Sequence, residues 1–293
     1  MLGTVPVEED GSVIFKAPAN TPISIQPLDK DGVAIQWMRS WVTGQPGEVV
    51  SCIGCHEDQN QIAIPKRVIA SQKAPSALTL PEGGTRSFTF DLEVQPILDR
   101  ACIACHNGEG KAFDLRGGKK DKLGYGTSYL NLHPYVHRQG GEGDMVVLQP
   151  YEYHPNTSEL VRLLKKGHHN VKLTDKEWKT LYNWIDYNAP DKGYFNANVL
   201  TDLPYKGFDQ IKRRKELTDK YANGAGVDWK KEIADYADYL KKQGPITPVM
   251  PEKAAPVKEK TLKVKGWPFG ADRIKEMLAK EKETRKVVRS LRV

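Results

Sequence analysis

The chain has 293 residues, of which 39% are hydrophobic and 28% are charged. This composition is typical of a globular protein that folds into one large domain or a few small ones. No apolar stretch approaches the roughly 18 residues that a membrane-spanning helix requires, so we expect no membrane span.

The formal net charge of +7 comes from one end of the chain. Residues 252–293 hold 13 Lys and Arg against 6 Asp and Glu, whereas basic and acidic side chains balance over residues 1–251. A protein that binds nucleic acid needs its basic excess on a folded face. We therefore interpret the excess as a solvated tail or linker and expect no nucleic-acid partner.

Residues 1–50 show the pattern of a β region. Apolar residues alternate on both sides of the turn sequence Asp-Lys-Asp-Gly at residues 29–32, which predicts a hairpin. Fifty residues make only part of a β-sandwich. We therefore expect this region to be the end of a larger β domain.

Residues 51–87 begin with a cysteine motif and continue as an irregular linker that contains several prolines. Residues 90–101 then predict a helix that leads into a second cysteine motif. Because Pro96 fits only in the first turn of a helix, this helix should begin around Gln95.

The clearest helix signals lie between residues 155 and 190. Gly167 is placed to end a first helix, and Thr174 with Glu177 forms a capping box that starts a second one. The second helix should end at residues 189–190, Ala-Pro. The first helix should bury one face, formed by Leu160, Leu163 and Leu164.

The last third of the chain is polar. Residues 208–243 predict helices, residues 244–268 are a linker rich in Pro and Lys, and residues 271–290 predict a charged amphipathic helix. The domain boundaries that we predict are 1–50, 51–87, 88–200, 201–243 and 244–293.

All four cysteines of the chain belong to two copies of the pattern Cys-x-x-Cys-His. This pattern is typical of c-type haem attachment. The two thiols bond to the porphyrin, and the adjacent histidine binds the iron. We therefore predict two c-type haems as cofactors. The residues that hold them are Cys52, Cys55 and His56 for the first haem, and Cys102, Cys105 and His106 for the second.

Three other interpretations account for paired cysteines. A zinc ribbon has two such pairs about 15–20 residues apart, whereas 46 residues separate Cys55 from Cys102. A thioredoxin-like pair would accompany a βαβ pattern, and two structural disulfides would suit an exported chain. None of the three explains why a histidine follows both pairs.

The other five histidines are candidates for the sixth ligand of each iron. His168 and His169 lie in a short loop between two predicted helices, which would hold a ring in place. We expect one of them to bind the second iron and prefer His169, which lies deeper in the loop. His154 is the next candidate, and it remains with His133 and His137 for the first iron.

Covalent haem attachment takes place outside the cytoplasm in bacteria, so we predict a periplasmic or otherwise extracytoplasmic location. The first residues lack the basic and apolar segments of a secretory signal, so we expect the chain to come from a longer exported protein. The predicted fold class is α+β, with a partial β-sandwich-like N-terminal region followed by mostly α-helical c-type haem domains.

Several separated motifs, in order along the chain, resemble one protein family. Residues 3–56, which include Val-Pro-Val-Glu-Glu-Asp-Gly and the first haem motif, resemble the middle and haem-binding portions of hydrazine synthase α-subunit-like proteins. Residues 88–106, 152–154, 166–169 and 184–186 resemble the second haem domain of the same family, whose members are exported planctomycete-type cytochromes.

The resemblance implies a β domain followed by two mostly helical haem domains. It also implies that two histidines bind the second haem, one of them from the Gly-His-His loop. It does not imply hydrazine synthesis. In the synthase a tyrosine shortly after the first motif binds the first haem, whereas Glu-Asp-Gln-Asn follows here at residues 57–60.

Three function classes remain. The first, which we prefer, is electron transfer through two six-coordinate haems to a redox partner protein. The alternative is a haem oxidoreductase whose first iron keeps an open face for a small nitrogen or oxygen compound, with Glu57 or Asp58 to move protons. The third is a haem-bearing scaffold among the domains or subunits of a larger exported assembly.

Overall fold

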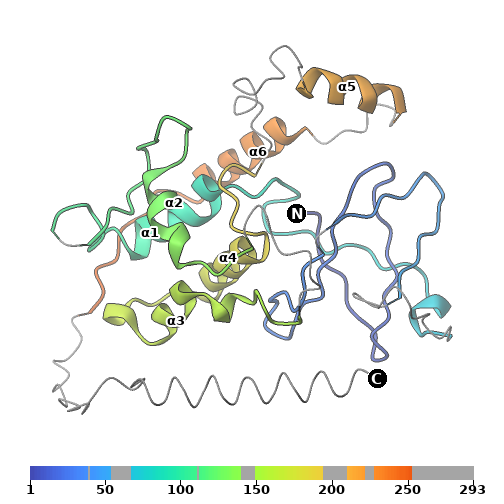
Figure 1. Ribbon diagram of the computed structural model, residues 1–293, viewed down its shortest axis with the longest axis horizontal. Coiled ribbons are helices and arrows are strands. Elements are labelled where there is room, and N and C mark those ends of the chain that lie inside the picture. The colour runs from blue at the N-terminus through green and yellow to red at the C-terminus, as the bar shows by residue number, and fades with distance from the viewer. Residues whose placement is uncertain are drawn as a thin grey trace, which may run out of the picture. The chain divides into compact units, whose positions relative to one another are not determined.

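The computed structural model describes residues 1–38, 40–53, 67–110, 112–139, 149–193, 210–221 and 228–252 (Figure 1). These residues belong to one compact unit, Met1–Lys253. None of the described helices is long and apolar enough to cross a membrane. The charged helix predicted over residues 271–290 lies outside the described residues.

Six α-helices occur in the described residues. They are α1 (Gln95–Ala101), α2 (Thr127–Leu132), α3 (Glu159–Lys165), α4 (Asp175–Asp186), α5 (Gln210–Tyr221) and α6 (Trp229–Lys242). The described residues also contain five short 3-10 or π-helical turns, which lie before or between the first four of these helices. The 3-10 turns are η1 (Ala70–Gln72), η3 (His133–Tyr135), η4 (Pro155–Thr157) and η5 (His168–Asn170), and the π-helical turn is η2 (Phe90–Val94). The start of α1 at Gln95 confirms the position that Pro96 predicts.

The N-terminal segment pairs through isolated bridges rather than continuous strands within the residues that the structure describes. The predicted turn at residues 29–32 is present: Leu28 and Ala34 form an antiparallel bridge. The Asp29 side chain organises this turn, because its Oδ1 accepts hydrogen bonds from the backbone N–H groups of Asp31 and Val33 at 2.9 and 3.0 Å. The predicted α+β class stays a prediction.

Burial after this turn does not follow the apolar alternation of the sequence. Val33, Ala34 and Trp37 are all buried, so neighbouring residues on opposite faces are both covered. The cover comes from distant parts of the chain: the Ala34 N–H donates to Asp186 of α4 at 2.9 Å. The Trp37 ring stacks on Tyr153 with 5.3 Å between ring centroids.

One apolar core joins η2, α1, α2, α3 and α4, which lie together in Figure 1. Trp184 of α4 is fully buried at its centre, with its ring 5.3 Å from Phe90 and 6.4 Å from Tyr129 between centroids. These aromatic side chains bury large apolar areas. The other buried members are Phe88, Val94, Ile97, Leu98, Leu115, Leu132, Val136, Leu160, Val161, Leu181, Ile185 and Ala189.

The two helices predicted between residues 155 and 190 are present with small differences. The capping box of α4 forms as predicted from Thr174 and Glu177. Leu163 is 39% exposed and Val161 is buried in its place, so the predicted apolar face of α3 is partly wrong. Helix α4 ends at Asp186, before residues 189–190, because Asn188 and Ala189 adopt left-handed backbone angles.

Helix α6 docks on η2 through a buried polar cluster. Arg86 and Glu93 form a buried ion pair with 2.5 Å between Nε and Oε1, and the Tyr236 hydroxyl donates to Glu93 Oε2 at 3.1 Å. The Arg86 guanidinium also lies 3.7 Å from the centroid of the Tyr236 ring. Gly83, with a φ of +82°, passes so close to this ring that a Cβ atom would lie 2.7 Å from it.

Candidate haem site

The second cysteine motif continues directly from α1. The backbone N–H of Cys102 donates to Leu98 at 2.8 Å, and those of Cys105 and His106 donate to the Cys102 carbonyl at 3.1 and 2.9 Å. The motif therefore forms a tight turn that places its two thiols and its imidazole at one end of the helix. Cys102 is partly buried and Cys105 is exposed.

The described cysteines carry free thiols. Cys52, Cys102 and Cys105 are not joined in disulfides, so the structural-disulfide interpretation finds no support in the second motif. Burial raises the pKa of the Cys102 thiol to about 12, which keeps it protonated at neutral pH. Thiols that are not joined in disulfides remain available to form thioether bonds.

The His106 ring has a defined orientation. Its Nδ1 lies 3.0 Å from the carbonyl oxygen of Phe113, and since a carbonyl only accepts, Nδ1 carries the proton. The Phe113 ring packs on the imidazole at 4.7 Å between centroids. In the neutral ring, Nε2 is then the nitrogen that can bind a metal ion.

The Gly-His-His loop between α3 and α4 brings a second imidazole to this place. Gly167 has a φ of +87°, and His169 and Asn170 follow with φ of +44° and +64°. Non-glycine residues in this left-handed region are strained by roughly 1–3 kcal/mol each, a cost found most often at functional sites. The bend places the His168 ring 6.1 Å from that of His106, between centroids.

His168 is held in the neutral form. Partial burial lowers its pKa below the usual value, and the nearby His169 and His106 rings lower it further. A neutral imidazole is the form that binds metals. His169 packs edge-on against His168 at 4.6 Å between centroids. The structure therefore places His168 beside His106, whereas the sequence-based preference was for His169.

The distance between the His106 and His168 rings matches the distance expected for two imidazoles that bind one iron. Imidazole nitrogens bind metals at about 2 Å, so two rings on opposite sides of one ion have centres about 6 Å apart, close to the observed 6.1 Å. Among the described residues no group of three or more His, Cys, Asp or Glu side chains could hold a metal ion. A haem iron needs only two protein ligands, because the porphyrin supplies the other four.

His154 and His137, two of the other candidates, make hydrogen bonds elsewhere. His154 is buried, its Nδ1 accepts from the Asn156 N–H at 3.2 Å, and its Nε2 lies 3.4 Å from Asp29 Oδ2. Both of its ring nitrogens are occupied, so binding iron would require one of these contacts to break. His137 pairs with the Thr157 hydroxyl at 2.8 Å through Nδ1.

His133 differs from these two histidines. Its Nε2 is buried without a hydrogen-bond partner in the part of the chain that the structure describes. Burial lowers its pKa, so the ring is neutral. It packs on Tyr129 at 5.3 Å between centroids.

Most of the first motif lies outside the described residues. Cys52 is exposed, and Ile53 beside it is 59% exposed. Cys55, His56 and the polar residues 57–60 are not described. The predicted first haem therefore stays a prediction from the sequence.

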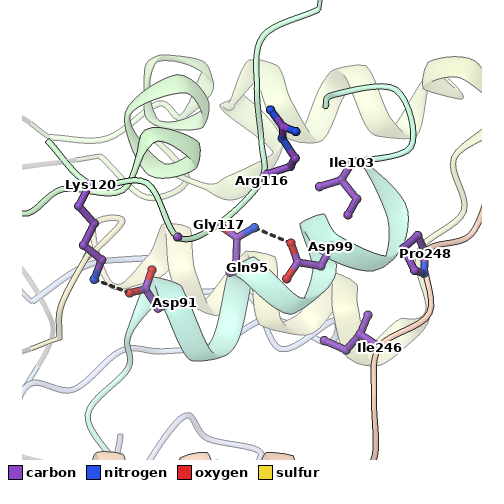
Figure 2. Close-up of a pocket in the computed structure, with 10 residues that line it drawn as sticks. Asp91, Gln95, Asp99, Ile103, Arg116, Gly117, Lys120, Ile246 and Pro248 are labelled. Atoms are coloured by element: carbon purple, nitrogen blue, oxygen red, sulfur yellow. Dashed lines mark hydrogen bonds and ion pairs between the residues drawn. The ribbon is translucent and has the colours of Figure 1, made fainter. Parts of the chain in front are cut away.

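A shallow cleft of about 610 Å³ lies along α1 and ends at the second motif (Figure 2). Its walls include Ile103 of the motif, and Figure 2 shows Lys120 paired with Asp91 and Gln95 with Asp99. None of the motif's sulfur or imidazole groups is among its lining residues. The cleft therefore offers no cysteine or histidine to a haem, and His106 with His168 remains the candidate site.

Two residues that position the site have no signal in the sequence. Phe113 orients His106 through its backbone carbonyl, which any residue could supply. Arg100, two residues before Cys102, contacts α4 and the end of the Gly-His-His loop. Neither contact follows from spacing or residue type.

Comparison with known proteins gives one match. Residues 1–57 match the family model of the hydrazine synthase alpha subunit middle domain. The N-terminal segment is similar to that domain. The match covers the predicted β region and the first haem motif, and no curated protein or solved structure matches the chain. The similarity supports a relationship with hydrazine synthase alpha-like proteins for this part of the chain.

Proposed function

We propose that the chain is an exported di-haem c-type cytochrome that transfers electrons. The observation that carries the proposal is the pairing of His106, with its Nδ1 committed to the Phe113 carbonyl, and His168 at 6.1 Å between ring centroids. The pairing lies beside two free thiols, Cys102 and Cys105. Covalent attachment and two axial imidazoles are what a six-coordinate c-type haem requires.

A haem bound here would supply a one-electron redox centre. The side chains of the protein would determine its behaviour. The hydrogen bond from His106 to the Phe113 carbonyl fixes the ring and makes Nε2 more basic. His168 offers a neutral ring without losing a proton first, because its pKa is lowered by burial. With both imidazoles bound, such a haem would offer no open position to a substrate, which would favour electron transfer over bond-making chemistry.

The family match supports the wider part of this proposal. A segment similar to the hydrazine synthase alpha middle domain fits a related haem-associated redox function. The match reaches residue 57 and therefore includes Cys52, Cys55 and His56, which we propose hold the first haem. An extracytoplasmic location, a redox partner protein and further domains or subunits of a larger assembly belong to the same proposal, as does the α+β architecture.

The same match favours a second candidate function. The matched domain belongs to a synthase subunit, so the first haem could serve an oxidoreductase with an open iron acting on a small nitrogen or oxygen compound. Added CO distinguishes the two candidates, because CO binds ferrous haem only where the sixth position is open. An electron carrier should leave both haems largely unreactive, whereas the enzyme should bind one equivalent rapidly.

The ligand assignment is tested with two alanine variants. His168→Ala should convert the second haem from low-spin to high-spin while the haem stays covalently attached. His169→Ala is the matched control and should change the spectrum little, because this ring only packs on its neighbour. The reverse result would assign the ligand to His169. A double variant that stays fully low-spin would contradict ligation from this loop.

A further inference from the structure

Arg100 ties the helix that carries the haem motif to the opposite side of the site. It is the penultimate residue of α1, two positions before Cys102. Its guanidinium forms a two-point ion pair with Glu177 of α4, in which Nη2 donates to Oε2 at 2.5 Å and Nε donates to Oε1. Nη2 also donates to the Lys172 carbonyl at 3.1 Å, four residues after His168.

The Glu177 carboxylate that pairs with Arg100 is itself held by hydrogen bonds. Glu177 belongs to the capping box of α4: its Oε2 accepts from the Thr174 N–H at 2.7 Å, and its own N–H donates to Thr174 Oγ1 at 3.3 Å. The Glu177 side chain is 15% exposed. Burial would raise the pKa of Glu177, but hydrogen bonds from Arg100 and Thr174 hold it below its usual value. A charge-assisted two-point pair in this setting has a defined geometry.

A second tether meets the same helix end. The Val249 N–H donates to the Arg100 carbonyl at 2.7 Å, so the extended segment after α6 crosses the last turn of α1. Farther along this segment, the Glu252 carbonyl accepts from Asn170 Nδ2 at 3.4 Å. The segment therefore also links the motif side to the Gly-His-His loop.

We propose that Arg100 and Glu177 form a clamp that sets the distance between His106 and the loop that carries His168. Arg100 is then a positioning residue for the sixth ligand of the second haem, an inference that rests on the proposed function. The clamp joins the two parts of the site. The haem motif directly follows Arg100, and the Gly-His-His loop ends at Lys172, which contacts Arg100, and Thr174, which contacts Glu177. Weakening the contact between Arg100 and Glu177 should let the Gly-His-His loop move away from His106.

The test compares three variants with a matched control in the purified holoprotein. Arg100→Gln removes the guanidinium, Arg100→Lys keeps the charge but loses the two-point geometry, and Glu177→Gln keeps a side chain that suits a capping box. Lys176→Gln is the control, since it removes a charge one residue away that pairs with Glu82 on the surface at 2.7 Å.

Arg100→Gln and Glu177→Gln should each give a roughly tenfold rise in the fraction of second haem that binds CO, the change that about 1.4 kcal/mol of lost tethering produces. A high-spin signal should appear in the same two variants, and backbone hydrogen exchange should become faster at residues 167–173. In all three measurements Arg100→Lys should give values between those of Arg100→Gln and the parent protein. Lys176→Gln should match the parent protein.

Two outcomes separate the clamp from the ligand assignment. If His168→Ala becomes high-spin but Arg100→Gln and Glu177→Gln keep the parent spectrum, CO reactivity and exchange rates, the clamp is refuted and the proposed function stands. If His168→Ala and His169→Ala both leave the spectrum unchanged, the ligand assignment has failed and the clamp fails with it. Should Arg100→Gln not fold, Glu177→Gln and Arg100→Lys decide the question by the same readouts.

Discussion

Replacing Asp186 should reveal a buried carboxyl whose charge weakens the fold at neutral pH. Asp186 is the last residue of α4 and is only 4% exposed. Its Oδ2 accepts from the Ala34 N–H at 2.9 Å, while its Oδ1 has no hydrogen-bond partner among the described residues. Burial raises the pKa of Asp186 to about 7; the bond from Ala34 opposes the rise and the charge of Asp29 adds to it.

The sign and size of the effect follow from the two pKa values. The folded pKa of about 7 lies above the ordinary value of 3.8, so the folded state holds the proton more tightly than the unfolded state. Stability from this group is therefore fully present below about pH 4 and is lost as the pH rises to about 7. At about 1.4 kcal/mol per pH unit, the loss amounts to about 4 kcal/mol.

Asp186→Asn removes the charge and keeps an oxygen for the Ala34 N–H. In urea unfolding of the holoprotein, the variant should exceed the parent at pH 8 by up to about 4 kcal/mol and equal it near pH 4. Asp175→Asn, at the exposed start of the same helix, is the control and should change stability by less than about 1 kcal/mol. A difference between Asp186→Asn and the parent that is the same at both pH values would refute the reasoning.

Two further variants test the cap of α4 and the buried ion pair between Arg86 and Glu93. Thr174→Ala removes the side-chain acceptor of the α4 cap and should cost about 1 kcal/mol in urea unfolding; an unchanged midpoint would mean that the cap contributes nothing. Glu93→Gln leaves the buried Arg86 guanidinium without its counter-charge and should cost about 3 kcal/mol or more. A loss below about 1 kcal/mol would show that the Tyr236 ring and the carbonyls of Glu82 and Gly84, which accept from Arg86 Nη1 at 2.7 and 3.0 Å, satisfy Arg86 without Glu93.

Local signals in the sequence predicted local structure well. Pro96 placed the start of α1 at Gln95, Thr174 and Glu177 predicted the cap of α4, and Gly167 predicted the end of α3. These features depend on residues within one or two turns of each other, so their physics is visible in a short window.

The failures came from contacts between distant segments. Ala34, which lies between the alternating apolar residues Val33 and Ile35, is buried as well because Asp186, far along the chain, contacts its backbone. The face of α3 shifted from Leu163 to Val161 in the same way, since the surrounding core decides which side is buried. A period of apolar residues cannot show which of two adjacent faces the rest of the protein will cover.

For the candidate site too, the sequence predicted the local features but not the contacts between distant segments. The thiols and His106 follow from the spacing of one motif, and the Gly-His-His loop could be singled out from its flanking helix signals. The choice between His168 and His169 depends on the left-handed backbone conformation of His169, which cannot be predicted from the type of residue. The Arg100 contacts join residues 72 and 77 positions apart and needed the structure.

Covalent haem is the central claim, and the intact mass of the purified protein tests it most directly. The protein should be produced in a host that attaches haem outside the cytoplasm, then stripped with acid and acetone before it is weighed. We predict the mass of the polypeptide plus two haems, because thioether bonds to Cys52, Cys55, Cys102 and Cys105 survive this extraction. The mass of the bare polypeptide, with zinc released on extraction, would contradict the account.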